Sequence, residues 1–499
     1  MFARLPNKLA LYAAMLLSLG VICLASVQHV YVLLFVIAGA LAYVAIRKDA
    51  IYYVVIPALL AYQLYLPLAV SVTLSSLVLV MLLLRSASQG KLMHYFRTQR
   101  LVRYYVALLI AMGVGIIYAP DRVLGFKLIA YSIIGLLALL AGYYYRTRGL
   151  SVEQTLRGIQ HVYLPIGLLN IYFIIAPDLE LQFLRSKIAS FLIEPNTLAA
   201  LINVDIKANI LDPYKAGTLF VNTNVASVFF GMMLCIALSL LLRKGSLLQL
   251  GICFIYLGAM LATQSRAGVL ALGIVVLAYV CIRFRVQKLF KLSLLLVIPA
   301  AIIPFIVTGD IITNLTSRLN ADAIEGDPRT YIWKFTFQNF AEHPLLGLGY
   351  GGWERIFPFY AATVGFSSKY PPHNLFVIMW TWSGLFGLIA LILLLFGILW
   401  RGIRLYYRTG SALDSCVVGA ALFVIVQGMF DNFFLHDLRV ASVFFFLAGL
   451  ILYEQRKDSD GELSSMDGRS QSGKQAGNGE GQAVQERALT PQTAEVGGK

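Results

Sequence analysis

His373 is the residue of this sequence best suited to move a proton. It follows Pro371-Pro372, which suit the first turn of a helix but not its interior, so His373 is predicted to lie in the opening turn of an apolar helix over 374–400. The positive end of a helix dipole disfavours an imidazolium, and a neutral imidazole accepts protons near neutral pH. The alternative is an interface histidine hydrogen-bonded to backbone.

Two arginines are candidates for binding an anion. Arg266 lies in the polar stretch Thr263–Gly268 between two apolar runs. This stretch is predicted on the extracytoplasmic side of the membrane, where an unpaired Arg is disfavoured. Asp327-Pro328 predicts a helix over 328–341, which puts Arg329 beside free N–H groups that attract anions. A phosphate partner would explain both positions, whereas the alternative for Arg329 is a solvated surface residue.

The stretch around His343 has more ordinary interpretations. Pro344 ends the preceding helix, so His343 fits a C-terminal cap as well as a functional residue. The run Gly347–Gly352 matches G-x-G-x-x-G but follows no strand–helix unit, so it indicates a tight turn at the membrane surface rather than a nucleotide site. The helix 328–341 carries a predicted aromatic face formed by Trp333, Phe337 and Phe340. The sequence shows no cluster of metal ligands and no cofactor motif.

The elements that must position these residues are membrane helices. Hydrophobic residues make up 59% of the 499 and charged residues only 13%, with mean hydropathy +0.76. This composition predicts an all-α polytopic membrane protein with 12–14 transmembrane helices, because barrel strands would alternate in polarity over short segments. The apolar runs are 9–27, 30–46, 51–66, 69–84, 102–119, 124–145, 159–176, 218–242, 246–263, 267–283, 289–307, 374–400, 413–430 and 438–453.

The distribution of Lys and Arg predicts the topology. Alternate connections are rich in cations, which places both termini in the cytoplasm. The transmembrane domain then covers 1–457, with large periplasmic segments over 177–217 and 308–372 and a disordered cytoplasmic tail over 458–499. The net charge of +15 is attributed to topology and contact with anionic membrane lipids, not to nucleic-acid binding. The N-terminal run does not have the pattern of a cleavable signal peptide.

Several of these residues resemble motifs of the O-antigen ligase / O-antigen polymerase superfamily of bacterial inner-membrane glycosyltransferases. The resemblance covers roughly 215–440, and the N-terminal half matches only as a bundle of spans. The matching pieces are Ala216–Asn224 at the start of a span, Thr263–Gly268, Arg329-x-x-x-Trp333, His343–Gly351 and His373-Asn374.

The resemblance to the ligases of this superfamily implies a function. It implies a GT-C-like fold, with short helices in the large periplasmic loop, and a metal-independent, inverting transfer of O-antigen polysaccharide from undecaprenyl diphosphate to a sugar hydroxyl of lipid A-core at the periplasmic face. His373 would be the catalytic base and Arg266 and Arg329 would bind the diphosphate. The other motif residues implied in substrate binding are His343, Asn222 and Asn224. Asp431 could orient the base or pair with Arg439.

Alternatives to a ligase stay open on sequence grounds. A polymerase of O-antigen or exopolysaccharide, or a protein O-oligosaccharyltransferase, would keep the donor and change the acceptor. A transporter of lipid-linked glycan is the alternative of another class. Transporters usually place polar residues near the bilayer midplane, whereas the candidates here cluster at one interface.

Overall fold

The computed structural model describes residues 51–65, 73–194, 197–198, 215–283, 328–365, 371–432 and 437–453. The chain divides by contacts into Met1–Glu454 and Gln455–Lys499, and all described residues belong to the first unit. The predicted spans over 9–27, 30–46 and 289–307 and the predicted tail over 458–499 lie outside the described residues.

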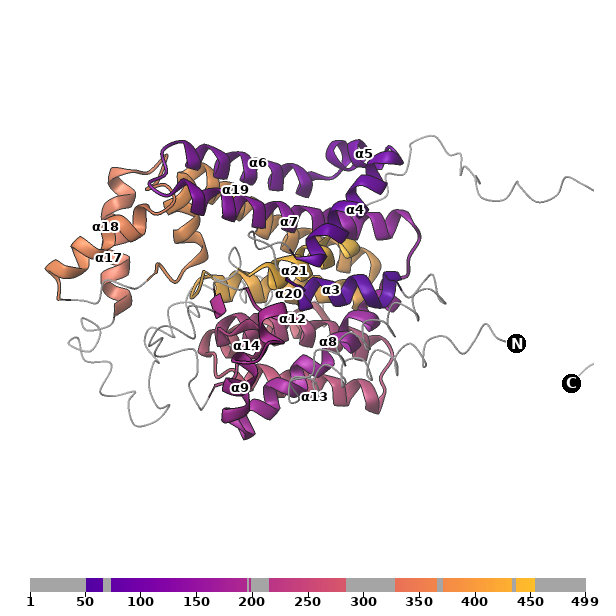
Figure 1. Ribbon diagram of the computed structural model, residues 1–499. Helices are drawn as coiled ribbons and strands as arrows, with labels where there is room; N and C mark the ends of the chain where they lie inside the picture. The colour runs from indigo at the N-terminus through magenta and orange to yellow at the C-terminus, as the bar shows by residue number, and fades with distance from the viewer. Residues whose placement is uncertain are drawn as a thin grey trace, which may run out of the picture. The chain divides into compact units, whose positions relative to one another are not determined.

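The described residues are almost entirely helical (Figure 1). They contain no β-strand beyond an isolated bridge between Tyr65 and Thr73. The α-helices and the shorter π- and 3₁₀-helices, marked η, are η1 Ile51–Val55, α3 Ile56–Tyr62, α4 Leu74–Ser88, α5 Lys91–Thr98, α6 Arg100–Ile117, α7 Arg122–Thr147, α8 Val152–Ile175, α9 Pro177–Leu184, α10 Ala189–Leu192, η2 Thr218–Phe220, α12 Thr223–Arg243, α13 Leu247–Ala262, α14 Arg266–Arg283, α17 Pro328–Glu342, α18 Gly352–Thr363, α19 Leu375–Thr409, η3 Ala412–Asp414, α20 Ser415–Gly428 and α21 Leu438–Leu452.

Several of these helices can cross a membrane. Within the described residues, α6, α7, α8, α12 and α19 are long and apolar enough, and the pair α4–α5, bent by 93°, could form a sixth span. Shorter apolar helices, among them α13, α20 and α21, pack with them. The prediction of an all-α polytopic membrane protein is confirmed. The predicted number of 12–14 spans includes runs outside the described residues and stays a prediction.

The helices pack through small residues and apolar surfaces. Figure 1 shows α20 and α21 between the α6–α19 pair and the α12–α13 pair. Helices α7 and α21 approach closely, because a Cβ atom at Gly142 would lie 2.5 Å from backbone atoms of Phe446 and Leu450. Every residue of α20 is buried. A polar side chain on this helix therefore lies in the protein interior and needs a partner.

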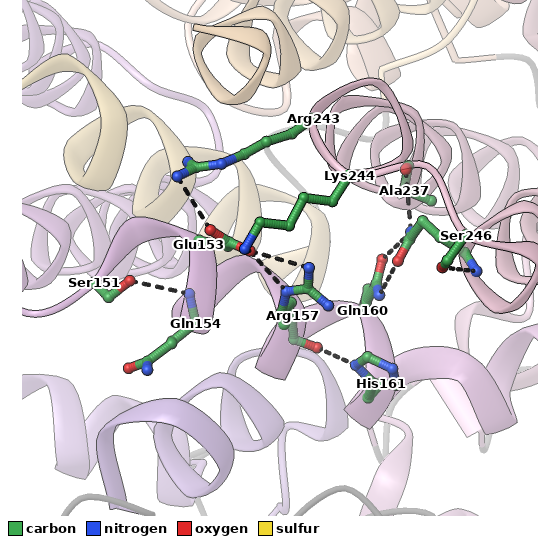
Figure 2. Close-up of polar contacts among 11 residues, drawn as sticks. Ser151, Glu153, Gln154, Arg157, Gln160, His161, Ala237, Arg243, Lys244 and Ser246 are labelled. Atoms are coloured by element: carbon green, nitrogen blue, oxygen red, sulfur yellow. Dashed lines mark hydrogen bonds and ion pairs between the residues drawn. The ribbon is translucent and has the colours of Figure 1, made fainter. Parts of the chain in front are cut away.

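A charged cluster joins α8 to the end of α12 (Figure 2). The Glu153 carboxylate lies 3.0 Å from Arg157, 3.2 Å from Arg243 and 3.8 Å from Lys244. Arg157 belongs to α8, whereas Arg243 and Lys244 stand at the end of α12. These residues meet at the end of the bundle where α12 finishes, which is opposite to the end where α12 begins.

Helices α17 and α18 pack on the first part of α19 through an aromatic cluster. Its buried members are Ile332, Phe335, Leu348, Trp353, Phe357, Ala361 and Trp380. Of the predicted aromatic face of α17, Phe340 packs against Trp380 with ring centroids 5.3 Å apart, and Phe337 is 65% exposed. Phe335 packs on Trp353 and Phe357 of α18, and Ile332, Thr336 and Asn339 of α17 are also buried. The side chain of Trp333 lies outside the description.

Candidate functional site

Three helices begin at the same end of the bundle, next to the end of α20. Asn222 caps α12 by accepting the N–H of Asn224, and Asn374 caps α19 by accepting the N–H groups of Phe376 and Val377. Ser265 precedes α14 and accepts the N–H of Gly268 at 3.3 Å. Side-chain hydrogen bonds link these starts to one another and to the end of α20. Free N–H groups and helix dipoles therefore make this end of the bundle positive.

Asn224 is the centre of a polar network between these helices. Its Nδ2 donates to Asp431 Oδ2 at 2.9 Å, and its Oδ1 accepts from Ser265 Oγ at 2.9 Å. Gln427 Nε2 donates to the Asn224 carbonyl at 2.8 Å and to Ser265 Oγ at 3.1 Å. The network ties the starts of α12 and α14 to the end of α20 and holds Asp431 in a fixed orientation.

His373 reaches this network through Asp431. Its Nδ1 lies 4.0 Å from Asp431 Oδ1, and its side chain is one-third exposed while that of Asp431 is buried. The Asn432 N–H donates to the same Oδ1 at 2.7 Å, so both carboxylate oxygens have partners. A distance of 4.0 Å is too long for a hydrogen bond, so the carboxylate acts on the imidazole mainly by charge.

The position of His373 differs from the sequence expectation. Helix α19 begins at Leu375, because Asn374 is its N-cap, and His373 stands before the cap with φ of +46°. His373 is therefore outside the first turn, although it remains at the positive end of the helix. The Asn374 Nδ2 group also donates to Met429 O at 2.9 Å, which anchors this entry to the end of α20.

Asp431 and Arg439 do not form the ion pair that the sequence allowed. The Arg439 guanidinium donates to the Leu219 carbonyl and lies over the ring of Phe220 at 5.3 Å. Both contacts belong to the loop that leads into α12. Asp431 instead faces His373 and Asn224.

The two candidate arginines begin helices. Arg266 is the first residue of α14, directly after Ser265, and is exposed. Among the described residues it forms no ion pair. Helix α17 starts at Pro328, as predicted, so Arg329 is in its first turn, but the side chain of Arg329 lies outside the description. Arg266 therefore directly follows Ser265, a member of the network.

His343 is not joined to the network within the described part of the chain. It is exposed and follows α17, where its N–H donates to Asn339 O at 2.8 Å. Its carbonyl accepts from Gly347 N–H at 3.0 Å, so its described contacts are those of a helix C-terminus.

The glycine run forms a turn that docks on α19. Gly347, Gly349 and Gly351 all have φ between +71° and +77°. A Cβ atom at Gly347 would lie 2.1 Å from Trp380 O, and the neighbouring Leu348 N–H donates to Thr381 O at 2.8 Å. Close backbone approach therefore explains the glycine at 347, and positive φ favours glycine at all three positions.

Sequence reasoning missed Ser265 and Gln427 as members of the network. Gln427 carried a usable signal, because a polar side chain inside the apolar run 413–430 needs a partner in the interior. Ser265 gave no such signal by itself. No group of three or more His, Cys, Asp or Glu side chains able to hold a metal is present in the described ranges. Metal independence stays a prediction.

A family comparison covers the middle of the chain. A family model described as O-antigen ligase matches residues 251–392. Residues 251–392 are thus similar to the O-antigen ligase family, in agreement with the resemblance that the motifs indicated. The matched segment contains Arg266, Arg329, His343 and His373, whereas Asn224 and Asp431 lie outside it. No curated protein matches the chain. Because the family consists of glycosyltransferase-like enzymes, the match supports an enzymatic role.

Proposed function

We propose that this protein transfers O-antigen polysaccharide from undecaprenyl diphosphate to a sugar hydroxyl of lipid A-core at the periplasmic face of the inner membrane. The single observation that carries the proposal is the juxtaposition of His373 and Asp431 with the starts of α12, α14 and α19. It combines a proton acceptor with a positive surface suited to a diphosphate.

The proposed step is a single displacement. The acceptor hydroxyl oxygen attacks the anomeric carbon, its proton passes to His373, and the bond from that carbon to the diphosphate oxygen breaks. The electron pair leaves with the diphosphate, so the configuration at the anomeric carbon is inverted. The imidazolium that forms is stabilised by the buried Asp431 carboxylate 4.0 Å from Nδ1. Nε2 is then the nitrogen that receives the proton.

The leaving diphosphate gains negative charge as the bond breaks. Arg266 and the N–H groups at the start of α14 are placed to stabilise that charge, and the proposal adds Arg329 from the start of α17. Arg266 is exposed at a helix start and forms no ion pair with any described residue, a position unfavourable for helix stability, which supports an anionic partner for it. Asn222 and Asn224 contribute by holding the site together, and substrate contact by His343 stays a prediction.

Deletion of the gene tests the function and separates it from the polymerase alternative. The ligase proposal predicts lipid A-core without any long chains and polymer accumulating on the lipid carrier. Core that bears a single repeat would instead indicate a polymerase, and unchanged core with long chains would contradict both. Expression of wild-type protein should restore long chains, and expression of His373→Ala should not.

A further inference from the structure

Unusual backbone conformations gather at the polar network. Five described non-glycine residues have positive φ, and four of them stand just before α12, α14 and α19: Thr218, Val221, Gln264 and His373. The fifth is Gln63. Thr218 and Val221 are β-branched, for which a left-handed conformation is most unfavourable. Both lie in the loop 216–222 that leads into α12, so this loop is held in a conformation its sequence does not favour.

Two side chains hold that loop from outside. Glu180 of α9 is buried, and its Oε1 accepts the N–H groups of Gly217 at 2.9 Å and Thr218 at 2.8 Å. The Arg439 guanidinium of α21 donates to the Leu219 carbonyl. The two residues come from helices far apart in the sequence and bind different peptide groups of the same loop.

We propose that Glu180 is a positioning residue that fixes the loop 216–222 and through it the catalytic pair Asp431 and His373. This inference rests on the proposed transferase function and deepens it. Glu180 holds Thr218 in its left-handed conformation, and four residues later Asn222 caps α12. Asn224, in the first turn of α12, then donates to Asp431.

The chemistry of Glu180 defines the useful substitutions. Its role is to accept two N–H groups, and a glutamine Oε1 can accept the same two bonds at the same reach. Burial raises the pKa of Glu180, while the hydrogen bonds from Gly217 and Thr218 lower it. An alanine accepts neither bond and leaves two N–H groups unpaired, so the loop loses its restraint on the Thr218 side.

The experiment compares Glu180→Gln and Glu180→Ala with wild type in a purified transfer assay. Glu180→Ala should lower kcat by about 10- to 100-fold, the scale expected when a catalytic group moves by about an ångström, with KM for the donor nearly unchanged. Glu180→Gln should keep most of the wild-type kcat. Equal activity of wild type and Glu180→Ala would overturn the positioning role, and so would an equal loss of kcat in both variants.

A second substitution tests the mechanism through the loop. Glycine adopts left-handed conformations without penalty, so Glu180→Ala/Thr218→Gly should recover part of the kcat lost in Glu180→Ala. No recovery would contradict positioning through this loop. If Glu180→Ala does not purify as a folded protein, Glu180→Asp replaces it under the same criteria, because its carboxylate is one methylene too short to accept both bonds.

A matched control lies at the other end of the bundle. Glu153 is also a carboxylate with several partners, namely Arg157, Arg243 and Lys244 (Figure 2). Glu153→Ala should lower the melting temperature without changing kcat. A kcat loss in Glu153→Ala similar to that in Glu180→Ala would mean that Glu180 acts only through the overall stability of the protein. Failure of the function itself is distinguishable, because wild type would then be inactive in this assay.

Discussion

Arg266 is an exposed cation at the start of α14. Its position in a polar stretch between apolar runs predicts either an ion-pair partner within the protein or a bound anion. In the structure, Arg266 forms no ion pair with any described residue. Arg266→Ala should abolish or severely reduce transfer while the protein remains in the membrane. Arg266→Lys should restore activity only in part, because an ammonium lacks the bidentate geometry of guanidinium. Transfer rates and immunoblots of membranes measure both, and full activity of Arg266→Ala would refute a diphosphate contact.

Residues that sequence alone could identify are those with a local signal. His373 and Arg266 had such signals in neighbouring prolines and in polarity at a span end. The pairing of Asn224 with Asp431 joins residues 207 positions apart, and no local pattern encodes it. The exact place of His373 was mispredicted for a local reason as well. The prolines predicted a first helical turn around His373, but Asn374 is the N-cap, so the helix begins after it at Leu375.

At the scale of elements, the kink in α19 depends on Gly384. This residue has φ +64° and ψ −161°, and a Cβ atom there would lie 1.9 Å from Leu345 O. Leu385 N–H donates to Pro344 O at 3.0 Å, so the kink also docks the loop after α17. Gly384→Ala should destabilise the protein by about 1–3 kcal/mol or more, as expected for forced backbone strain. Melting in detergent measures it. The control is Gly273→Ala in α14, where a Cβ meets nothing within 4 Å and no loss is expected.

An ion pair between α7 and the segment after α10 gives a prediction about pH. Burial raises the pKa of Glu194, whereas the hydrogen bonds from Lys127, Thr197 and Tyr131 and the charge of Lys127 lower it. The lowering is the larger effect, so the pKa of Glu194 falls below the ordinary 4.5. A lowered carboxyl pKa stabilises the fold above the ordinary value and loses that contribution as pH falls through the folded pKa. The melting temperature should therefore drop below pH 4.5, and the drop should be smaller in Glu194→Gln. An identical pH dependence in both proteins would contradict the assignment.

Helix α17 shows which elements the sequence predicts well. Its start at Pro328 was predicted from a capping residue followed by proline, which are local signals. Phe335, which is not part of the predicted aromatic face, packs on α18, whereas Phe337 of that face is 65% exposed. That choice is made by the partner helix and by the docking of the glycine run, which no periodicity within α17 can reveal.

At the scale of the whole molecule, composition and charge predict the class of protein and a topology. The all-helical membrane class is confirmed, and the membrane sides stay a prediction. A reporter inserted near Ile324 should be periplasmic and one fused after Asp458 cytoplasmic, because cation-rich connections stay inside. Enzymatic reporters such as alkaline phosphatase and β-galactosidase distinguish the two sides. A cytoplasmic result at Ile324 would remove the segment with Arg329 and His343 from the periplasmic face and exclude the proposed reaction there.

The most direct test of the proposed mechanism is transfer by purified His373→Ala. With lipid-linked polysaccharide as donor and lipid A-core as acceptor, the rate should fall by about 10²–10⁴-fold, the usual effect of removing a general base. Donor binding should be nearly unchanged, because His373 acts on the acceptor hydroxyl, and EDTA should have no effect on wild type. His94→Ala, on the exposed surface of α5, is the control and should be fully active. Wild-type turnover by His373→Ala, or strict dependence on a divalent ion, would contradict His373 as the base of a metal-independent transferase.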